Sequence, residues 1–144
     1  MSRRAKLLIG LLAVLLTGWA WHGPLGNGAR LLDGLEAEAR AAVAEAELAG
    51  IEVRMARDPL ARVATLSGEA NDLQREGLGS GQGLSDSVRG VEGIGKVRWA
   101  DEPAAEARTM PLLAETLLLL ILAYAIGLGL ARFLWGRPKR DSYL

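Results

Sequence analysis

The stretch TLLLLILAYAIGLGLA, residues 116–131, contains no charged side chain. It lies inside a longer apolar segment, residues 110–135, whose only charges are Glu115 near its start and Arg132 near its end. A helix rising about 1.5 Å per residue needs roughly 20 apolar residues to cross a bilayer. With Pro111 in its first turn and the Arg132 side chain extended toward the far headgroups, this segment predicts a transmembrane helix. A chain of 144 residues has too little other core to bury a helix that is apolar on all sides.

A second apolar run, LLIGLLAVLLTGWAW at residues 7–21, follows a basic N-terminus. This layout fits a secretory signal peptide cleaved after Ala20. Trp19 and Trp21 instead suit the aromatic belt of a retained helix. The sequence favours a signal-anchor helix over residues 1–21 and leaves cleavage open as the alternative. Either interpretation exports the residues that follow.

The charges are distributed unevenly along a chain whose formal net charge is zero. Both ends are basic, including the tail at residues 136–144, whereas the region between the apolar runs holds 10 basic and 15 acidic residues. Basic flanks stay in the cytoplasm. We therefore expect a protein of the bacterial inner membrane with both termini cytoplasmic and the central domain periplasmic. An acidic domain without a contiguous basic face argues against binding to nucleic acid.

The central region, residues 28–100, alternates between helical and strand patterns. Apolar residues recur at helical spacing through residues 31–50, and Gly50 is placed to end that helix. Residues 51–55 and 63–66 alternate or cluster as strands do, and we expect a long hairpin loop, Ala56–Arg62, between them. Ser67-Gly68 then predicts a sharp turn with positive φ at the glycine.

The second half of this region predicts further short elements. Asn71 or Asp72 can cap a helical turn, the Gly77–Gly83 stretch interrupts the helix, and residues 84–89 resume it. A third strand is expected over residues 94–99, with Val97 and Trp99 on one face. Residues 101–109 form a polar linker. The fold class is therefore α+β, a small αββαβ domain between N- and C-terminal transmembrane helices.

Two motifs in this region resemble those of the BON domain, a family found in bacterial envelope and osmotic-stress proteins. The stretch ATLSGEA, residues 64–70, is similar to the family's turn, and VRGVEGIGKV, residues 88–97, is similar to its spaced apolar motif. The matching turn and core positions are Leu66, Gly68, Val91, Ile94 and Val97. The resemblance covers about residues 30–100. It implies a module that binds lipid or envelope components, not a catalyst.

The residue types needed for catalysis or metal binding are sparse. His22 is the single histidine and the chain has no cysteine, so the sequence predicts no metal site, no cofactor and no enzyme. The glycines of residues 77–83 lack the lysine and Ser/Thr of a phosphate loop. A flexible loop is favoured there, and a contact loop for a partner remains the alternative.

The C-terminal apolar segment carries two features suited to partner binding. Glu115 is ionisable, and it either reaches the headgroups or pairs with a partner subunit. Small residues form two adjacent ridges that permit close helix packing, either with the first apolar helix or with another protein: Ala123, Gly127 and Ala131, and beside them Ala125 and Gly129.

Two functions remain open. One is a non-enzymatic scaffold that contacts membrane lipid, cell wall or protein. The other is an accessory subunit of a larger integral-membrane complex (respiratory, photosynthetic or secretion), held by a membrane protein partner or by self-association.

Overall fold

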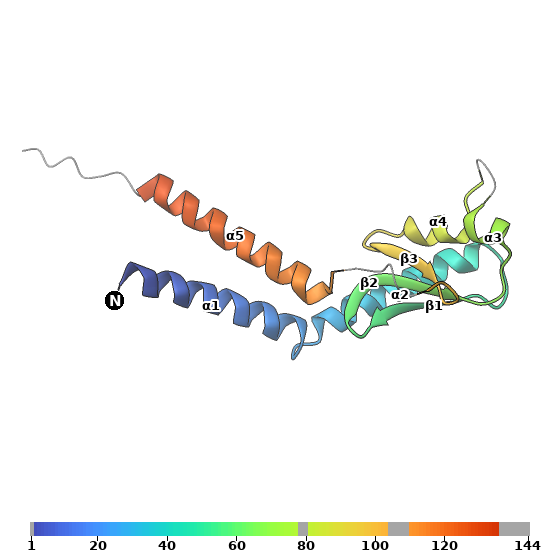
Figure 1. The fold of residues 1–144 in the computed structure, drawn as a ribbon, viewed down its shortest axis with the longest axis horizontal. Coiled ribbons are helices and arrows are strands. Elements are labelled where there is room, and N and C mark those ends of the chain that lie inside the picture. Colours follow the sequence, from blue (N-terminus) through green and yellow to red (C-terminus); the bar gives the residue numbers. More distant parts are fainter. Residues whose placement is uncertain (1, 78–80, 104–109, 136–144) are drawn as a thin grey trace, which may run out of the picture.

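The computed structural model describes residues 2–77, 81–103 and 110–135. Two long apolar helices, α1 (Arg3–His22) and α5 (Leu112–Trp135), flank a small α/β region and extend from the same end of it (Figure 1). The α+β class and the two long flanking helices are thus confirmed. The basic tail predicted at residues 136–144 and most of the predicted linker lie outside the described residues.

The α/β region contains a three-stranded mixed sheet with helices on one face. Its elements in chain order are α2 (Asn27–Glu45), β1 (Glu52–Arg57), β2 (Leu60–Ser67), α3 (Asp72–Glu76), α4 (Leu84–Arg89) and β3 (Lys96–Trp99). The strand order is β1-β2-β3, with β1 antiparallel and β3 parallel to the central β2. Helix α2 packs on β1 and β2, and α4 packs on β3.

The core lies between the sheet and these two helices. Leu32 and Ala39 of α2 are fully buried, as are Leu66 of β2 and Val88 of α4. Trp99 of β3 is 3% exposed, and its indole N–H donates to the Ser85 hydroxyl over 3.1 Å. Buried residues alternate along most of β1 and along β3, and together with Ala64 and Leu66 of β2 they supply this core from one face of the sheet. In β2 the neighbouring Val63 and Ala64 are both buried, so the alternation is interrupted there.

Helix α2 ends earlier than the sequence predicts. We expected Gly50 to terminate it, but the last helical residue is Glu45 and Ala46 is the C-cap. Glu47 adopts a φ of 54° and Gly50 a φ of 83°, so the chain turns twice before β1 begins. Alanine and glutamate favour helix at every position of this run, so the composition gives no sign of the earlier end.

The predicted hairpin loop Ala56–Arg62 is wrong. Strand β1 continues to Arg57 and β2 starts at Leu60, which leaves only Asp58 and Pro59 in the turn. The register shifts between Met55 and Ala56. This irregularity breaks the regular alternation of apolar residues, which hides the strand ends in the sequence.

The short helices follow the predicted pattern more closely. Asn71 caps α3 and forms a capping box, in which its side chain accepts from the Gln74 N–H and the Gln74 side chain accepts from the Asn71 N–H. The glycine-rich stretch separates α3 from α4, and residues 78–80 within it lie outside the described residues. Val97 and Trp99 are both buried on one face of β3.

Candidate functional site

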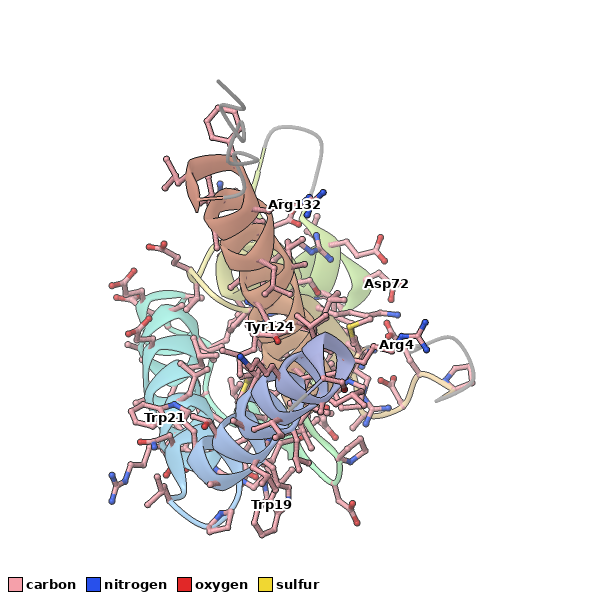
Figure 2. The ribbon with its side chains drawn as sticks, turned by 90° about the vertical axis from the view of Figure 1, so that its left-hand side faces the viewer. Arg4, Trp19, Trp21, Asp72, Tyr124 and Arg132 are labelled. Atoms are coloured by element: carbon pink, nitrogen blue, oxygen red, sulfur yellow. The ribbon has the colours of Figure 1, made fainter. Side chains whose placement is uncertain are left out.

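The two long apolar helices lie side by side and run in opposite directions (Figures 1 and 2). Two glycines of α1 lie in this contact. A Cβ atom on Gly10 would lie 2.5 Å from the Tyr124 hydroxyl, and one on Gly18 would lie 2.8 Å from methyl groups of Leu117 and Leu120. The Tyr124 hydroxyl donates to the Leu7 carbonyl oxygen over 2.9 Å. Glycine therefore allows the close approach of α1 and α5.

The remaining surface of the pair is apolar and exposed. Both helices are long and apolar enough to cross a membrane, by length and composition. Large apolar side chains that are 40% exposed or more cover both helices away from their contact, among them Leu8, Ile9, Leu12 and Leu16 of α1 and Leu118, Leu119, Leu122 and Ile126 of α5. In water, so large an exposed apolar surface is unfavourable, which is consistent with insertion into a membrane.

The predicted small-residue ridges of α5 are exposed, and α1 does not cover their glycines. A Cβ atom on Gly127 or Gly129 would meet no atom within 4 Å among the described residues. Ala123, Ala125 and Ala131 are also exposed. At their glycines the ridges are therefore not covered by α1 or by any other described residue. Gly10 and Gly18, two turns apart in α1, make the contact instead.

Replacing Gly18 with leucine is expected to weaken the pairing of α1 with α5 by about 1–3 kcal/mol, because the new side chain must displace Leu117 and Leu120. A membrane two-hybrid assay with the two helices on separate chains measures this directly. Gly127→Leu is the matched control and should leave the α1–α5 signal unchanged. Equal effects of the two substitutions would contradict the observed packing.

Glu115 joins α5 to the sheet. Its carboxylate lies 2.7 Å from a guanidinium nitrogen of Arg62 on β2. Leu112, one turn earlier, is 6% exposed. The charged group that the sequence assigned to headgroups or to a partner subunit thus has a partner within its own chain. The sequence did not indicate Arg62 as the partner of Glu115, because Arg62 lay in the predicted hairpin loop.

The turn between α1 and α2, residues 23–26, folds back onto the last turn of α1. The Leu25 N–H donates to the Ala20 carbonyl over 3.0 Å, and the Asn27 side chain donates to the Trp21 carbonyl over 3.2 Å. The His22 ring packs against Gly28, where a Cβ atom would lie 2.6 Å from it. His22 therefore fills the corner between two helices. This connection is called the elbow below.

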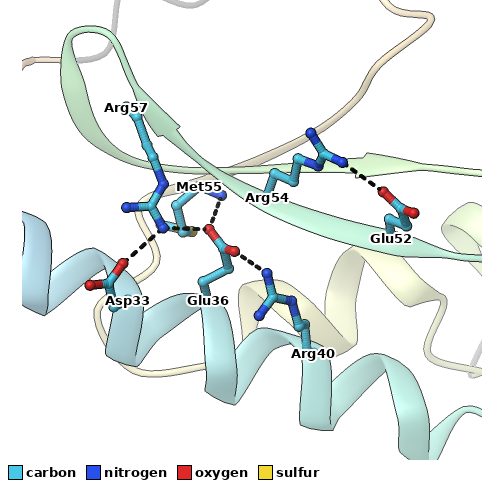
Figure 3. Close-up of polar contacts among 7 residues, drawn as sticks. All are labelled: Asp33, Glu36, Arg40, Glu52, Arg54, Met55 and Arg57. Carbon is cyan, nitrogen blue, oxygen red and sulfur yellow. Dashed lines mark hydrogen bonds and ion pairs between the residues drawn. The ribbon is translucent and has the colours of Figure 1, made fainter.

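A buried carboxylate fixes α2 to the edge strand β1 (Figure 3). Glu36 is 7% exposed, accepts from the Met55 N–H over 3.0 Å and from Arg57 over 3.1 Å, and pairs with Arg40 one turn along the helix. Arg57 also pairs with Asp33 over 2.9 Å. The spacing of Glu36 from Leu32 and Ala39 places it on the apolar stripe of α2, a signal that the sequence analysis missed.

The ionisation of this cluster follows from its contacts. Burial alone would raise the pKa of Glu36, but the hydrogen bonds from Met55 and Arg57 and the charge of Arg40 outweigh it and lower the pKa. Hydrogen bonds to Asp33 and Glu36 raise the pKa of Arg57. Glu36 is therefore a carboxylate at neutral pH and acts as a hydrogen-bond acceptor.

Two open pockets lie at the end of the domain farthest from the helix pair. A groove of about 540 Å³ lies between α2 and β1. Its charged lining is Arg40, Glu52 and Arg54, and its apolar lining is Val43, Ala44, Leu48, Ile51 and Val53. A polar pocket of about 440 Å³ lies beside Trp99, whose ring is covered by Arg75 at 4.2 Å. A hydrogen bond from Arg75 lowers the pKa of Asp101. Among the described residues no group of three or more His, Cys, Asp or Glu side chains could hold a metal ion.

The positions that carry the BON resemblance belong to the turn and core of the domain. Leu66, Ile94 and Val97 are buried in the core cluster, and Val91 packs against it. Gly68 has a φ of 134°, and a Cβ atom there would lie 2.3 Å from the Gly50 carbonyl oxygen. These residues build the fold, and among them is no group that touches a pocket described above.

Comparison of the chain with protein-family models, with curated proteins and with solved structures gives no match.

Proposed function

We propose that this chain is a non-enzymatic protein of the bacterial inner membrane that presents a small BON-like domain on the periplasmic side for binding or scaffolding within the envelope. The observation that carries the proposal is the antiparallel pairing of α1 and α5 with their apolar side chains exposed. An antiparallel pair places both chain ends on one side of a membrane and the domain on the other.

The positive-inside rule assigns the side. Helix α1 starts and α5 ends at the side of the pair far from the domain (Figure 1), and the basic residues Arg4, Lys6 and Arg132 belong to these helix ends. Because basic flanks remain cytoplasmic, this end faces the cytoplasm and the acidic domain is periplasmic. The contacts of Gly10 and Gly18 with α5 favour an N-terminal helix that is retained after export over one cleaved after Ala20.

Single-cysteine labelling tests this topology, and the chain offers a background free of cysteine. In intact cells whose outer membrane has been permeabilised, a membrane-impermeant maleimide is expected to label Glu92→Cys and not Ser2→Cys. Both residues are exposed, so Ser2→Cys should react once the inner membrane is opened. Labelling of Ser2→Cys in intact cells would contradict the orientation. If mass spectrometry shows that the mature protein lacks residue 2, the N-terminal segment has been cleaved.

The second candidate function is an accessory subunit of a larger integral-membrane complex. It is favoured by one observation: Gly127 and Gly129, one on each of the two small-residue ridges, are covered by no described part of the chain. Extraction in gentle detergent followed by native gel electrophoresis and mass spectrometry distinguishes the two. A discrete complex that Gly127→Leu disrupts supports the subunit, and free protein supports the scaffold.

A further inference from the structure

We propose that the elbow, together with the adjoining ends of α1 and α2, forms a lipid-binding surface that seats the domain in the periplasmic headgroup layer of the bilayer, so that the domain is held against the membrane. The surface consists of four exposed side chains, Trp19, Trp21, Leu25 and Leu31, and is called the elbow collar below. Its ligand is the headgroup and upper acyl-chain region of the bilayer that α1 crosses. The inference rests on the proposed function.

Helix α1 as a whole is long enough to cross a membrane, but its charge-free part is shorter than the hydrocarbon layer. Its charge-free part, residues 7–21, extends about 22 Å at roughly 1.5 Å per residue. The hydrocarbon layer is about 30 Å thick. A span that is too short forces the bilayer to thin or brings flanking residues into contact with lipid. On the cytoplasmic side Lys6 can extend its side chain to the headgroups. On the periplasmic side the elbow is the flank.

The elbow is positioned to extend the apolar surface beyond the end of α1. The hydrogen bond from the Leu25 N–H to the Ala20 carbonyl places Leu25 at the depth of the last turn of α1. Helix α2 starts beside it at Asn27, so Leu31 lies about 6 Å farther along, at about 1.5 Å per residue. Apolar side chains therefore continue past the end of α1 by roughly the thickness of one headgroup layer.

The four collar side chains are more exposed than most large apolar side chains of the domain. Trp19 and Trp21 are 57% and 58% exposed, Leu25 is 57% exposed and Leu31 is 48% exposed. Between α1 and α5, the other described large apolar side chains with such exposure are Leu73, in α3, and Met110 just before α5. Helix α3 lies at the opposite end of the domain (Figure 1). Tryptophan favours the interface between lipid and water, and leucine beside it gains by leaving water.

The test compares leucines of similar exposure at different depths. Leu25→Cys, Leu31→Cys and Leu73→Cys each carry an environment-sensitive fluorophore on the otherwise cysteine-free full chain. Leu12→Cys, 56% exposed within α1, reports on membrane insertion itself. The protein is reconstituted at low density into vesicles of phosphatidylethanolamine and phosphatidylglycerol. One set of vesicles contains a lipid with a doxyl quencher near the headgroup, read at positions 25, 31 and 73, and another contains a lipid with the quencher deep in the acyl chain, read at position 12. None of these side chains belongs to the core, so each variant is expected to fold.

The expected result is a blue-shifted emission and a loss of intensity with the quencher at positions 25 and 31, with no loss at position 73. If the probe at position 12 is quenched but the probes at positions 25 and 31 lose no more intensity than the probe at position 73, the collar is overturned and the membrane span stands. An unquenched probe at position 12 would overturn the proposed membrane span and the collar with it. Quenching at 25 and 31 that disappears as the protein density rises would assign the surface to a second copy, against the proposal.

Discussion

Replacing Gly68 with alanine is expected to lower the free energy of unfolding of the domain by about 2–3 kcal/mol. Two independent effects combine. Its φ of 134° is a conformation that residues with a Cβ atom rarely adopt, and the new Cβ would lie 2.3 Å from the backbone oxygen of Gly50. Backbone atoms cannot move aside as the end of a flexible side chain can, so the turn after β2 must distort.

Chemical unfolding of the full chain in detergent, followed by near-ultraviolet circular dichroism, measures this loss. Gly34→Ala is the matched control. Gly34 lies within α2 and a Cβ atom there would meet nothing within 4 Å, so this substitution should stabilise the domain by about 0.5–1 kcal/mol. The same chemical change is thus expected to have opposite signs at the two sites. Equal effects would show that the turn geometry at Gly68 is wrong.

Replacing Glu36 with glutamine is expected to cost about 2–3 kcal/mol at neutral pH. The amide keeps the shape of the side chain but loses the charge of a buried carboxylate that pairs with Arg40 and Arg57, which are themselves partly exposed. Glu38→Gln, at an exposed position of the same helix, should change stability by no more than about 0.5 kcal/mol. The same unfolding experiment distinguishes them.

The loss caused by Glu36→Gln is also expected to depend on pH. Because folding lowers the pKa of Glu36 below its ordinary value of 4.5, the wild-type carboxylate contributes its full stabilisation above that pH. As pH falls through the lowered pKa the contribution is lost, so the difference between wild type and Glu36→Gln should shrink. A difference that stays constant down to strongly acidic pH would contradict the role of the charge.

The sequence was sufficient for the apolar helices and for most of the small elements. A charge-free run of 16 residues identifies α5 without any tertiary information, and the pair Asn71-Asp72 locates the start of α3 to within one residue. These signals are local. The early end of α2 and the short turn at Asp58-Pro59 depend instead on what the chain packs against, and neither alanine-rich helix nor irregular strand reveals that in its composition.

The candidate site was less accessible to sequence reasoning, because its contacts join residues far apart in the chain. Glu115 was recognised as unusual, but its partner Arg62 is 53 positions away and lies in a stretch that we predicted as a loop. The small-residue ridge at Gly127 was recognised, whereas the glycines that contact the partner helix are Gly10 and Gly18. Small residues occur on several faces of both helices, and only the packing selects one.

The Glu36 carboxylate has one more consequence, which concerns the open side of β1. With the strand order β1-β2-β3, β1 is an edge strand, and such strands offer unpaired N–H groups to the strands of other molecules. The Glu36 carboxylate accepts a hydrogen bond from the Met55 N–H, a group that would otherwise be free to bond a fourth strand. A single helix side chain thereby substitutes for a missing strand at that position and discourages copies of the protein from joining edge to edge into a continuous sheet.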